Sequence, residues 1–257
     1  MASVADSFGD YGRNGSLAPS QRAARAVNHV IAWVIAVVLL LMAALAGYAL
    51  WDANQVLKGT DYSQYEPGLG FADLRKLNPD VVAWITVDNT GIDHPVVQGE
   101  DNFEYLDKDA KGNDGASGSI FLDSECDPDF EETYEVLYGH HMQAGKMFGD
   151  LDKFLDEGFF NANQRAILYL PSETLSLQVC AVVKADAYDG VLFSTPADST
   201  RVPQVIQKLE AEATYLREGS LVGSDHLIAL STCSSDGANE RTVVICKVTG
   251  RQQADNA

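Results

Sequence analysis

The longest apolar segment of the chain is an uninterrupted run near its N-terminus. Residues 30–50, VIAWVIAVVLLLMAALAGYAL, contain no charged side chain. At about 1.5 Å per residue, a helix of this length crosses the roughly 30 Å hydrocarbon core of a bilayer. The run therefore predicts one transmembrane helix.

The flanks of this run predict its orientation. Arg22 and Arg25 precede it, whereas Asp52 follows it. Because Lys and Arg are enriched on the cytoplasmic side of membrane helices, we expect residues 1–29 in the cytoplasm and the rest of the chain outside the cell, on a single-pass anchor. A cleaved signal peptide is the competing interpretation, since residues 44–46 (Ala-Leu-Ala) resemble a cleavage site. The length of the leader and of the apolar run favours the anchor.

Downstream of the run the apolar pattern becomes short and β-like. Segments rich in Val, Ile, Leu and Tyr are separated by Gly, Asp, Asn and Pro, as in strands joined by turns. Eight strands are predicted, at residues 81–87, 94–97, 119–122, 134–138, 166–170, 175–185, 227–232 and 242–248.

Helical periodicity is confined to a few places in this region. It covers residues 71–77 and 202–216, and a shorter helix is expected at 147–155. Eight short strands with a helix before the seventh predict a mainly β domain, either a closed barrel or a sandwich. Residues 51–70, with several Gly and Pro, are expected to be an extracellular linker, and residues 251–257 a flexible tail.

Composition and charge narrow the class of partner. The chain is 46% hydrophobic and 21% charged, which is ordinary globular composition. It has 18 Lys and Arg against 37 Asp and Glu, for a formal net charge of −19. A nucleic-acid partner is excluded on this basis, because neutralising phosphates requires clustered Lys and Arg.

Candidate chemistry is concentrated near the end of the chain, in LIALSTCSSDGANERTVVICKV. Cys233 closes one predicted strand and Arg241 opens the next. If these strands are neighbours, a thiol and a guanidinium lie at the same end of both, where the arginine could hold a substrate oxygen. Taken alone, such a cysteine is more often an inert buried thiol.

A nucleophilic thiol needs a proton-transfer partner, and a pair of histidines offers one. His140 and His141 follow the predicted strand that ends at Tyr138. Because side chains alternate in direction along a strand, at most one of the two histidines can face the thiol. A solvated Gly-His-His turn is the plainer interpretation of the same residues.

The remaining cysteines and a run of acidic residues are assigned no chemistry. Cys180 and Cys246 fall in apolar strands and are expected to be buried thiols, with a disulfide between them left open, whereas Cys126 falls in an acidic loop. For the run of acidic residues, a solvated loop is favoured over a Ca²⁺ site, because the residues lack the glycine-pivoted spacing of an EF-hand. Neither a metal nor a cofactor is therefore predicted. The acidic residues are Asp123, Glu125, Asp127, Asp129, Glu131 and Glu132.

The sequence on either side of Cys233 favours a catalytic thiol over the inert one expected of an isolated cysteine. Residues 230–233 (LSTC), with Arg241 downstream and residues 138–140 (YGH) upstream, resemble the active-site signature of the sortases, the membrane-anchored cysteine transpeptidases of Gram-positive bacteria, and more narrowly of class B. The similarity continues in collinear order through LRKLNPDVVAWITVDNTGIDHPVVQGEDN at 74–102, SGSIFLD at 117–123 and GHHMQAGKMFGDL at 139–151.

This resemblance implies a fold and a set of roles. The fold would be an eight-stranded sortase β-barrel with N-terminal helices and a long helix in the loop before strand 7, and residues 71–250 would be the catalytic domain. Cys233 would be the nucleophile, His140 the general acid and base, and Arg241 the group that orients substrate and steadies the oxyanion. Residues matching the substrate groove of the class B enzymes are Asn102, Leu106, Tyr138 and Ser231.

The same resemblance implies the reaction and its partners. The enzyme would cleave a C-terminal sorting signal after Thr and, through a thioacyl intermediate, join the surface protein that bears it to a peptidoglycan amine. Joining pilin subunits, hydrolysis without transfer, and binding without catalysis are the alternatives. Two departures from the family pattern are Ala229, where Thr is usual, and Ser234, where some relatives carry a charge. The second leaves peptide preference open.

Overall fold

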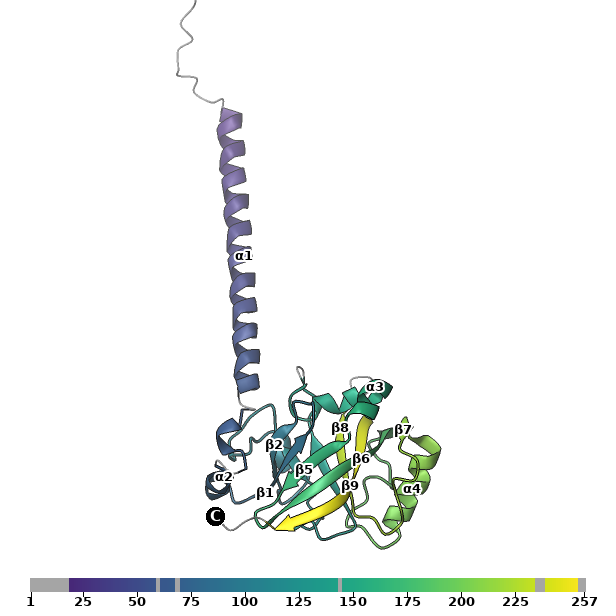
Figure 1. The fold of residues 1–257 in the computed structure, drawn as a ribbon. Helices are drawn as coiled ribbons and strands as arrows, with labels where there is room; N and C mark the ends of the chain where they lie inside the picture. The colour runs from purple at the N-terminus through teal and green to yellow at the C-terminus, as the bar shows by residue number, and fades with distance from the viewer. Residues whose placement is uncertain (1–18, 59–60, 68–69, 143–144, 234–238, 254–257) are drawn as a thin grey trace, which may run out of the picture. The chain divides into compact units, whose positions relative to one another are not determined.

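The computed structural model describes residues 19–58, 61–67, 70–142, 145–233 and 239–253. The chain forms two compact units, Met1–Ala53 and Asn54–Ala257. The first unit contains most of one long helix, and the second contains every strand (Figure 1).

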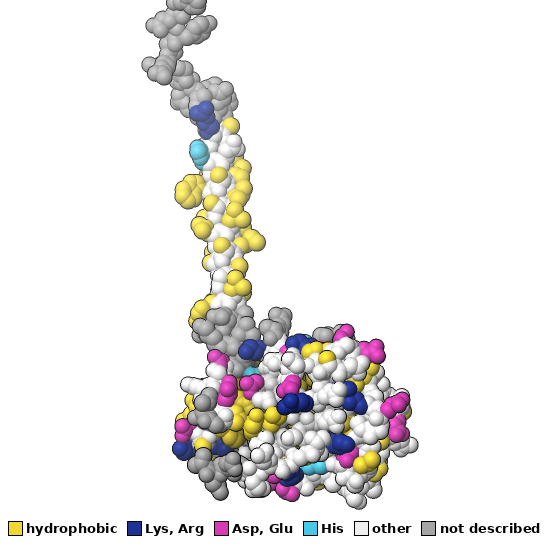
Figure 2. Space-filling view, viewed as in Figure 1, with side chains coloured by type: hydrophobic (Ala, Val, Ile, Leu, Met, Phe, Trp, Pro, Cys, Tyr) yellow, Lys and Arg dark blue, Asp and Glu magenta, His cyan; other side chains and the backbone are white. Residues whose placement is uncertain are grey.

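Helix α1 (Pro19–Lys58) extends beyond the predicted span at both ends. Residues Ala23–Trp51 within it contain an 18-residue window with a mean hydropathy of 2.8, and the span is long and apolar enough to cross a bilayer. Apolar side chains run along the helix in Figure 2, and most of its large hydrophobic residues are about half exposed or more, as at Leu50 with 73%. A helix that offers an apolar surface of this kind is compatible with a membrane anchor or a signal sequence.

The second unit is built on a closed barrel of eight strands. Neighbours in order are β5, β1, β2, β3, β4, β8, β9 and β6, and β6 pairs with β5 to close the ring. The predicted barrel is therefore confirmed over the sandwich, and each of the eight predicted segments coincides with a barrel strand. The strands are β1 (Val81–Val87), β2 (Asp93–Val97), β3 (Ile120–Leu122), β4 (Tyr134–Gly139), β5 (Arg165–Tyr169), β6 (Glu173–Asp186), β8 (Leu227–Cys233) and β9 (Glu240–Gln253).

In the second unit the labelled helices α2, α3 and α4 lie on the outside of the barrel (Figure 1). The described helices after α1 are η1 (Ser63–Tyr65), α2 (Phe71–Leu77), η2 (Glu104–Leu106), η4 (Gly149–Leu155), α3 (Glu157–Ala162) and α4 (Arg201–Glu212). The predicted helix at 71–77 is confirmed, the one at 147–155 is a 3₁₀ helix, and α3 was not predicted. The helix expected at 202–216 is too long by one turn, because residues Tyr215–Leu216 form strand β7, which pairs with β6.

Three groups of buried side chains hold the domain together. The first fills the barrel and includes Ile85, Leu137 and Phe148. The second lies between the barrel wall and α4, where Val205 and Leu209 pack on the sheet. The third includes Tyr62, which is 4% exposed although it falls in the predicted linker. Part of that segment therefore belongs to the folded domain.

The ends of other segments also differ from expectation. β9 runs to Gln253, three residues into the predicted tail, because its long ladder with β6 continues to the Glu173–Gln253 pair. Residues 254–257 lie outside the described part of the chain. Cys126, Cys180 and Cys246 are all buried free thiols, so the open disulfide between Cys180 and Cys246 is not formed. Burial raises the pKa of all three thiols.

Candidate active site

Strand order explains why the candidate residues meet. β4 and β8 are parallel neighbours, with Gly139 opposite Thr232, so the segments that follow them start at the same end of the barrel. β9 is antiparallel to β8, and its Arg241 pairs in register with Cys233. The C-terminal ends of two strands and the N-terminal end of a third thus converge.

A cavity of about 370 Å³ opens at this convergence. It brings together five of the predicted site residues, from β4 and the residue that follows it, from β9, and from the segment before β3. Its wall is mainly apolar, which suits an extended peptide with a few polar anchors. The lining residues are Asn102, Phe103, Leu106, Phe121, Tyr138, Gly139, His140, Ala187, Phe193 and Arg241.

His140 is held by the backbone of η2. Its Nε2 lies 2.8 Å from the carbonyl oxygen of Leu106. A carbonyl oxygen can only accept, so this bond places the ring hydrogen on Nε2. In the neutral imidazole Nδ1 is then the basic nitrogen, and it is the atom available for proton transfer.

Two glycines make room for this arrangement. Gly118 has a φ of +57°, and a Cβ there would come within 2.4 Å of the Leu106 carbonyl oxygen and 2.9 Å of His140 Cδ2. A Cβ at Gly139 would come within 2.8 Å of the Phe148 ring. Larger residues at either position would displace the histidine or the strand end that carries it.

His141 has partners of its own. Its Nε2 lies 3.1 Å from Asp152 Oδ2, and the other oxygen of that carboxylate accepts a 2.6 Å hydrogen bond from the Thr242 hydroxyl. Asp152 thereby links the histidine turn through η4 to the beginning of β9. His141 does not line the cavity.

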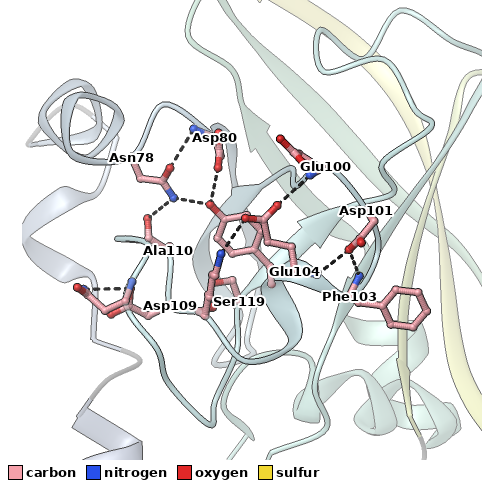
Figure 3. Close-up of polar contacts among 12 residues, drawn as sticks. Asn78, Asp80, Glu100, Asp101, Phe103, Glu104, Asp109, Ala110 and Ser119 are labelled. Carbon is pink, nitrogen blue, oxygen red and sulfur yellow. Dashed lines mark hydrogen bonds and ion pairs between the residues drawn. The ribbon is translucent and has the colours of Figure 1, made fainter.

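A polar network supports the segment that carries Asn102 and Leu106 (Figure 3). The Tyr105 hydroxyl donates to Asp80 Oδ2 at 2.7 Å and accepts from Asn78 Nδ2 at 2.8 Å. The Asp101 carboxylate caps the start of η2 by accepting from the backbone N–H groups of residues 103 and 104. The 3₁₀ turn that presents the Leu106 carbonyl to His140 is therefore held at its start by Asp101 and at its middle residue by the Tyr105 hydroxyl.

Asn102 and Tyr138 meet at a shared buried carboxylate. Asp123 Oδ2 accepts from Asn102 Nδ2 at 2.9 Å and from the Tyr138 hydroxyl at 3.1 Å. Burial raises the pKa of Tyr138, and the charge of Asp123 adds to the effect. Both side chains therefore enter the groove in fixed positions, with the phenol protonated.

Ser231 is placed differently from the other predicted groove residues. It is fully buried in β8, opposite Tyr138 and Val243, and it does not line the cavity. Its Oγ has no hydrogen-bond partner among the described residues. Ala229 lies two residues before it on the same strand, fully buried, and Ser234 lies outside the described residues.

Several residues of the site were not found from the sequence. Phe103, Phe121 and Phe193 line the cavity, and nothing in their local pattern distinguished them from core phenylalanines. Asp123 was assigned to a solvated acidic loop, which is wrong for this residue: it is 2% exposed and accepts four hydrogen bonds. In the parts of the chain that the structure describes, no cluster of three or more metal-binding side chains occurs.

Comparison with known proteins agrees with this geometry. The family model described as "Sortase domain" matches residues 85–249. Sortase B of Listeria monocytogenes is 31% identical over 169 residues, which is 66% of this chain and 69% of that protein.

Solved structures extend the agreement to the fold. Clostridium perfringens sortase B superposes with a TM-score of 0.65 at 33% identity, covering 70% of this chain and 100% of that one. A class B sortase of Streptococcus pyogenes involved in pilus biogenesis gives the same TM-score at 33% identity, covering 71% and 100%. The chain thus belongs to the sortase family of cysteine transpeptidases, and within it to class B.

Proposed function

We propose that this sortase cleaves a C-terminal sorting signal after Thr and transfers the protein to a peptidoglycan amine. The observation that carries the proposal is the cavity that joins His140 and Arg241, beside the Cys233 backbone, to the groove residues Asn102 and Tyr138. A peptide laid along the groove would present its carbonyl at the converging strand ends.

The first half of the reaction forms a thioacyl enzyme. The Cys233 thiolate attacks the Thr carbonyl carbon, and Arg241 stabilises the oxygen that becomes negative. His140 Nδ1 takes the proton of the Cys233 thiol as the thiolate forms, and it donates that proton to the leaving amine when the C–N bond breaks. The Leu106 carbonyl, which holds Nε2–H, keeps the ring oriented throughout.

The second half regenerates the enzyme. An amine of the cell wall attacks the thioester carbon, and His140 Nδ1 takes the proton that the amine loses. The Cys233 sulfur then leaves as thiolate, and an amide joins the surface protein to the wall. Residues 30–50 would hold the catalytic domain outside the cell with residues 1–29 in the cytoplasm, which raises the effective concentration of membrane-held substrates.

A transpeptidation assay tests this proposal. The full-length chain in detergent and its Cys233→Ala variant would be incubated with peptides of the NPxTx and LPxTG kinds, with and without an oligoglycine or diaminopimelate-type amine. Mass spectrometry should find an amine-dependent ligated product with the wild type and none with the variant. Peptide cleavage at the same rate with and without the amine, and without a ligated product, would instead indicate a hydrolase.

Pilin joining is the second candidate. The Streptococcus pyogenes relative, 33% identical, is described as involved in pilus biogenesis. In that reaction the acceptor for this enzyme would be a side-chain amine of a second protein rather than a wall amine. Offering a lysine-containing peptide as acceptor in the same assay separates the two, because the preferred amine gives the larger ligated yield.

A further inference from the structure

A buried carboxylate at the end of β3 ties together three segments that are far apart in the sequence. Asp123 Oδ2 accepts from Asn102 and Tyr138, as described above, and Oδ1 accepts from the Thr195 hydroxyl at 2.7 Å and from the Glu125 N–H at 3.0 Å. Thr195 belongs to the loop between β6 and α4. Asp123 therefore contacts the segment before η2, strand β4 and this loop at one point.

The same three segments form the walls of a groove. A second hollow of about 520 Å³ shares Asn102, Phe103, Tyr138, Ala187 and Phe193 with the cavity at His140. Asp123 and Thr195 line this second hollow. The groove thus runs from the converging strand ends past the carboxylate that joins its walls.

We propose that Asp123 is a positioning residue that sets the spacing of the peptide groove by accepting one side-chain hydrogen bond from each wall. The inference rests on the proposed function, in which this groove binds the sorting signal. Asp123 itself is 2% exposed and both of its oxygens are occupied, so it acts through Asn102, Tyr138 and Thr195 rather than on the peptide.

The chemistry of a carboxylate suits this role. Its two oxygens accept about four hydrogen bonds, and bonds to a charged acceptor are stronger than neutral ones. An amide of the same shape has one acceptor oxygen, and its NH₂ group would face an N–H or O–H donor on one side. A wall displaced by about 1 Å misplaces the bound peptide, which can lower kcat/KM by up to about two orders of magnitude.

The first test is Asp123→Asn in the full-length enzyme. We expect KM for the sorting peptide to rise about tenfold while kcat stays within about threefold, since the reacting groups are untouched. Glu173→Gln is the matched control. Glu173 is also a buried carboxylate, 7% exposed and bonded to Arg251, but it lies at the end of the β6–β9 ladder away from Arg241 and the cavity. Its KM should not change. An unchanged KM in Asp123→Asn, or a loss confined to kcat, would overturn the proposal.

Thr195 gives a milder pair of variants in case Asp123→Asn does not fold. Thr195→Val removes the hydroxyl and should raise KM about threefold, whereas Thr195→Ser keeps the hydroxyl and should restore the wild-type value within about twofold. Adding Thr195→Val to Asp123→Asn should raise KM by less than the product of the two single effects, because both variants weaken the same hydrogen-bonded junction. Equal KM values for the Val and Ser variants would argue against the shared carboxylate.

Amide hydrogen exchange tests the positioning role of Asp123 without any substrate. In Asp123→Asn, exchange should accelerate in residues 100–106, 123–126 and 193–195 and stay unchanged in the β6–β9 ladder. Uniform acceleration across the domain would mean that Asp123 serves only general stability. If the wild type processes no peptide, the proposed function fails, and the exchange pattern still tests the role of Asp123.

Discussion

Each end of strand β9 has an arginine with a histidine nearby, but the surroundings of the two pairs differ. At one end Arg251 donates to Glu131 and Glu173 at 2.8 and 2.7 Å, and to the Phe130 carbonyl. Beside it the His226 Nε2 lies 2.6 Å from a carboxylate oxygen of Glu135, which is fully buried. At the other end Arg241 and His140 line a cavity of about 370 Å³.

If the proposed mechanism holds, neighbouring groups rather than residue type separate a structural arginine and histidine from a catalytic pair. Acidic side chains surround the arginine and histidine at the Arg251 end and convert them into an internal cross-link between strands. At the Arg241 end a backbone carbonyl orients His140 and the cavity leaves space for a substrate.

Cys233→Ala should abolish transpeptidation. Without the thiolate no thioacyl intermediate forms, so kcat/KM should fall by at least about 10³-fold. The measurement is peptide turnover in the full-length enzyme, with the thermal unfolding midpoint checked in parallel. Residual turnover within about tenfold of the wild type would remove Cys233 from the nucleophile's role.

Matched arginine substitutions compare the two ends directly. Arg241→Lys keeps the charge but loses the planar fork, so kcat/KM should fall about 10²-fold with little change in stability. Arg251→Lys should leave kcat/KM unchanged and lower the free energy of unfolding by about 1–2 kcal/mol, because the buried Glu173 loses a well-placed partner. Urea unfolding and peptide turnover measure both quantities.

The opposite results for the two arginine variants would contradict the assignment of one end to catalysis and the other to stability. If Arg251→Lys lowered turnover as much as Arg241→Lys, the far end would be coupled to catalysis. If Arg241→Lys unfolded the domain, Arg241 would be a structural residue like Arg251.

A third histidine sharpens the contrast through pH. His94 is 3% exposed, neither ring nitrogen has a hydrogen-bond partner among the described residues, and burial lowers its pKa from 6.5 to about 4. Between these values the unfolded chain binds more protons than the folded one, so stability falls as the pH drops from 6.5 toward 4. The loss should be about 2 kcal/mol at about pH 5 relative to neutral pH.

Urea unfolding at about pH 5 and pH 7.5 measures this effect. His94→Leu should show a pH dependence smaller by about 2 kcal/mol, because Leu does not titrate. Equal pH dependence in the two proteins would show that other groups cause the acid sensitivity.

Phe103→Ala should give the smallest effect. The ring is 75% exposed, points away from the network around η2 and lines both hollows of the groove (Figure 3). Losing it should raise KM for the peptide about two- to fivefold and leave the unfolding midpoint unchanged, since little buried area is lost. Leu77→Ala, in α2 and 61% exposed, is the control that should change neither.

Much of this protein was determined by local sequence. The apolar run at 30–50 is long enough to specify a helix. Short apolar segments bounded by turn residues specify strands such as Leu227–Cys233. Cys233 and Arg241 could be paired from the sequence alone, since only seven residues lie between them in the chain. The boundary of α4 was missed because Tyr215–Leu216 gain backbone partners on β6, which no local pattern records.

Only the tertiary structure decided which residues share a cavity. His140 meets Arg241 because β4 is the parallel neighbour of β8, although almost ninety residues separate these two strands in the chain. Asp123 became a buried junction because Asn102, Tyr138 and Thr195 arrive from three segments. Hydrophobic periodicity reports which face of an element is buried. It does not report which elements become neighbours, and long-range pairing alone supplies the partners that make a charge structural or catalytic.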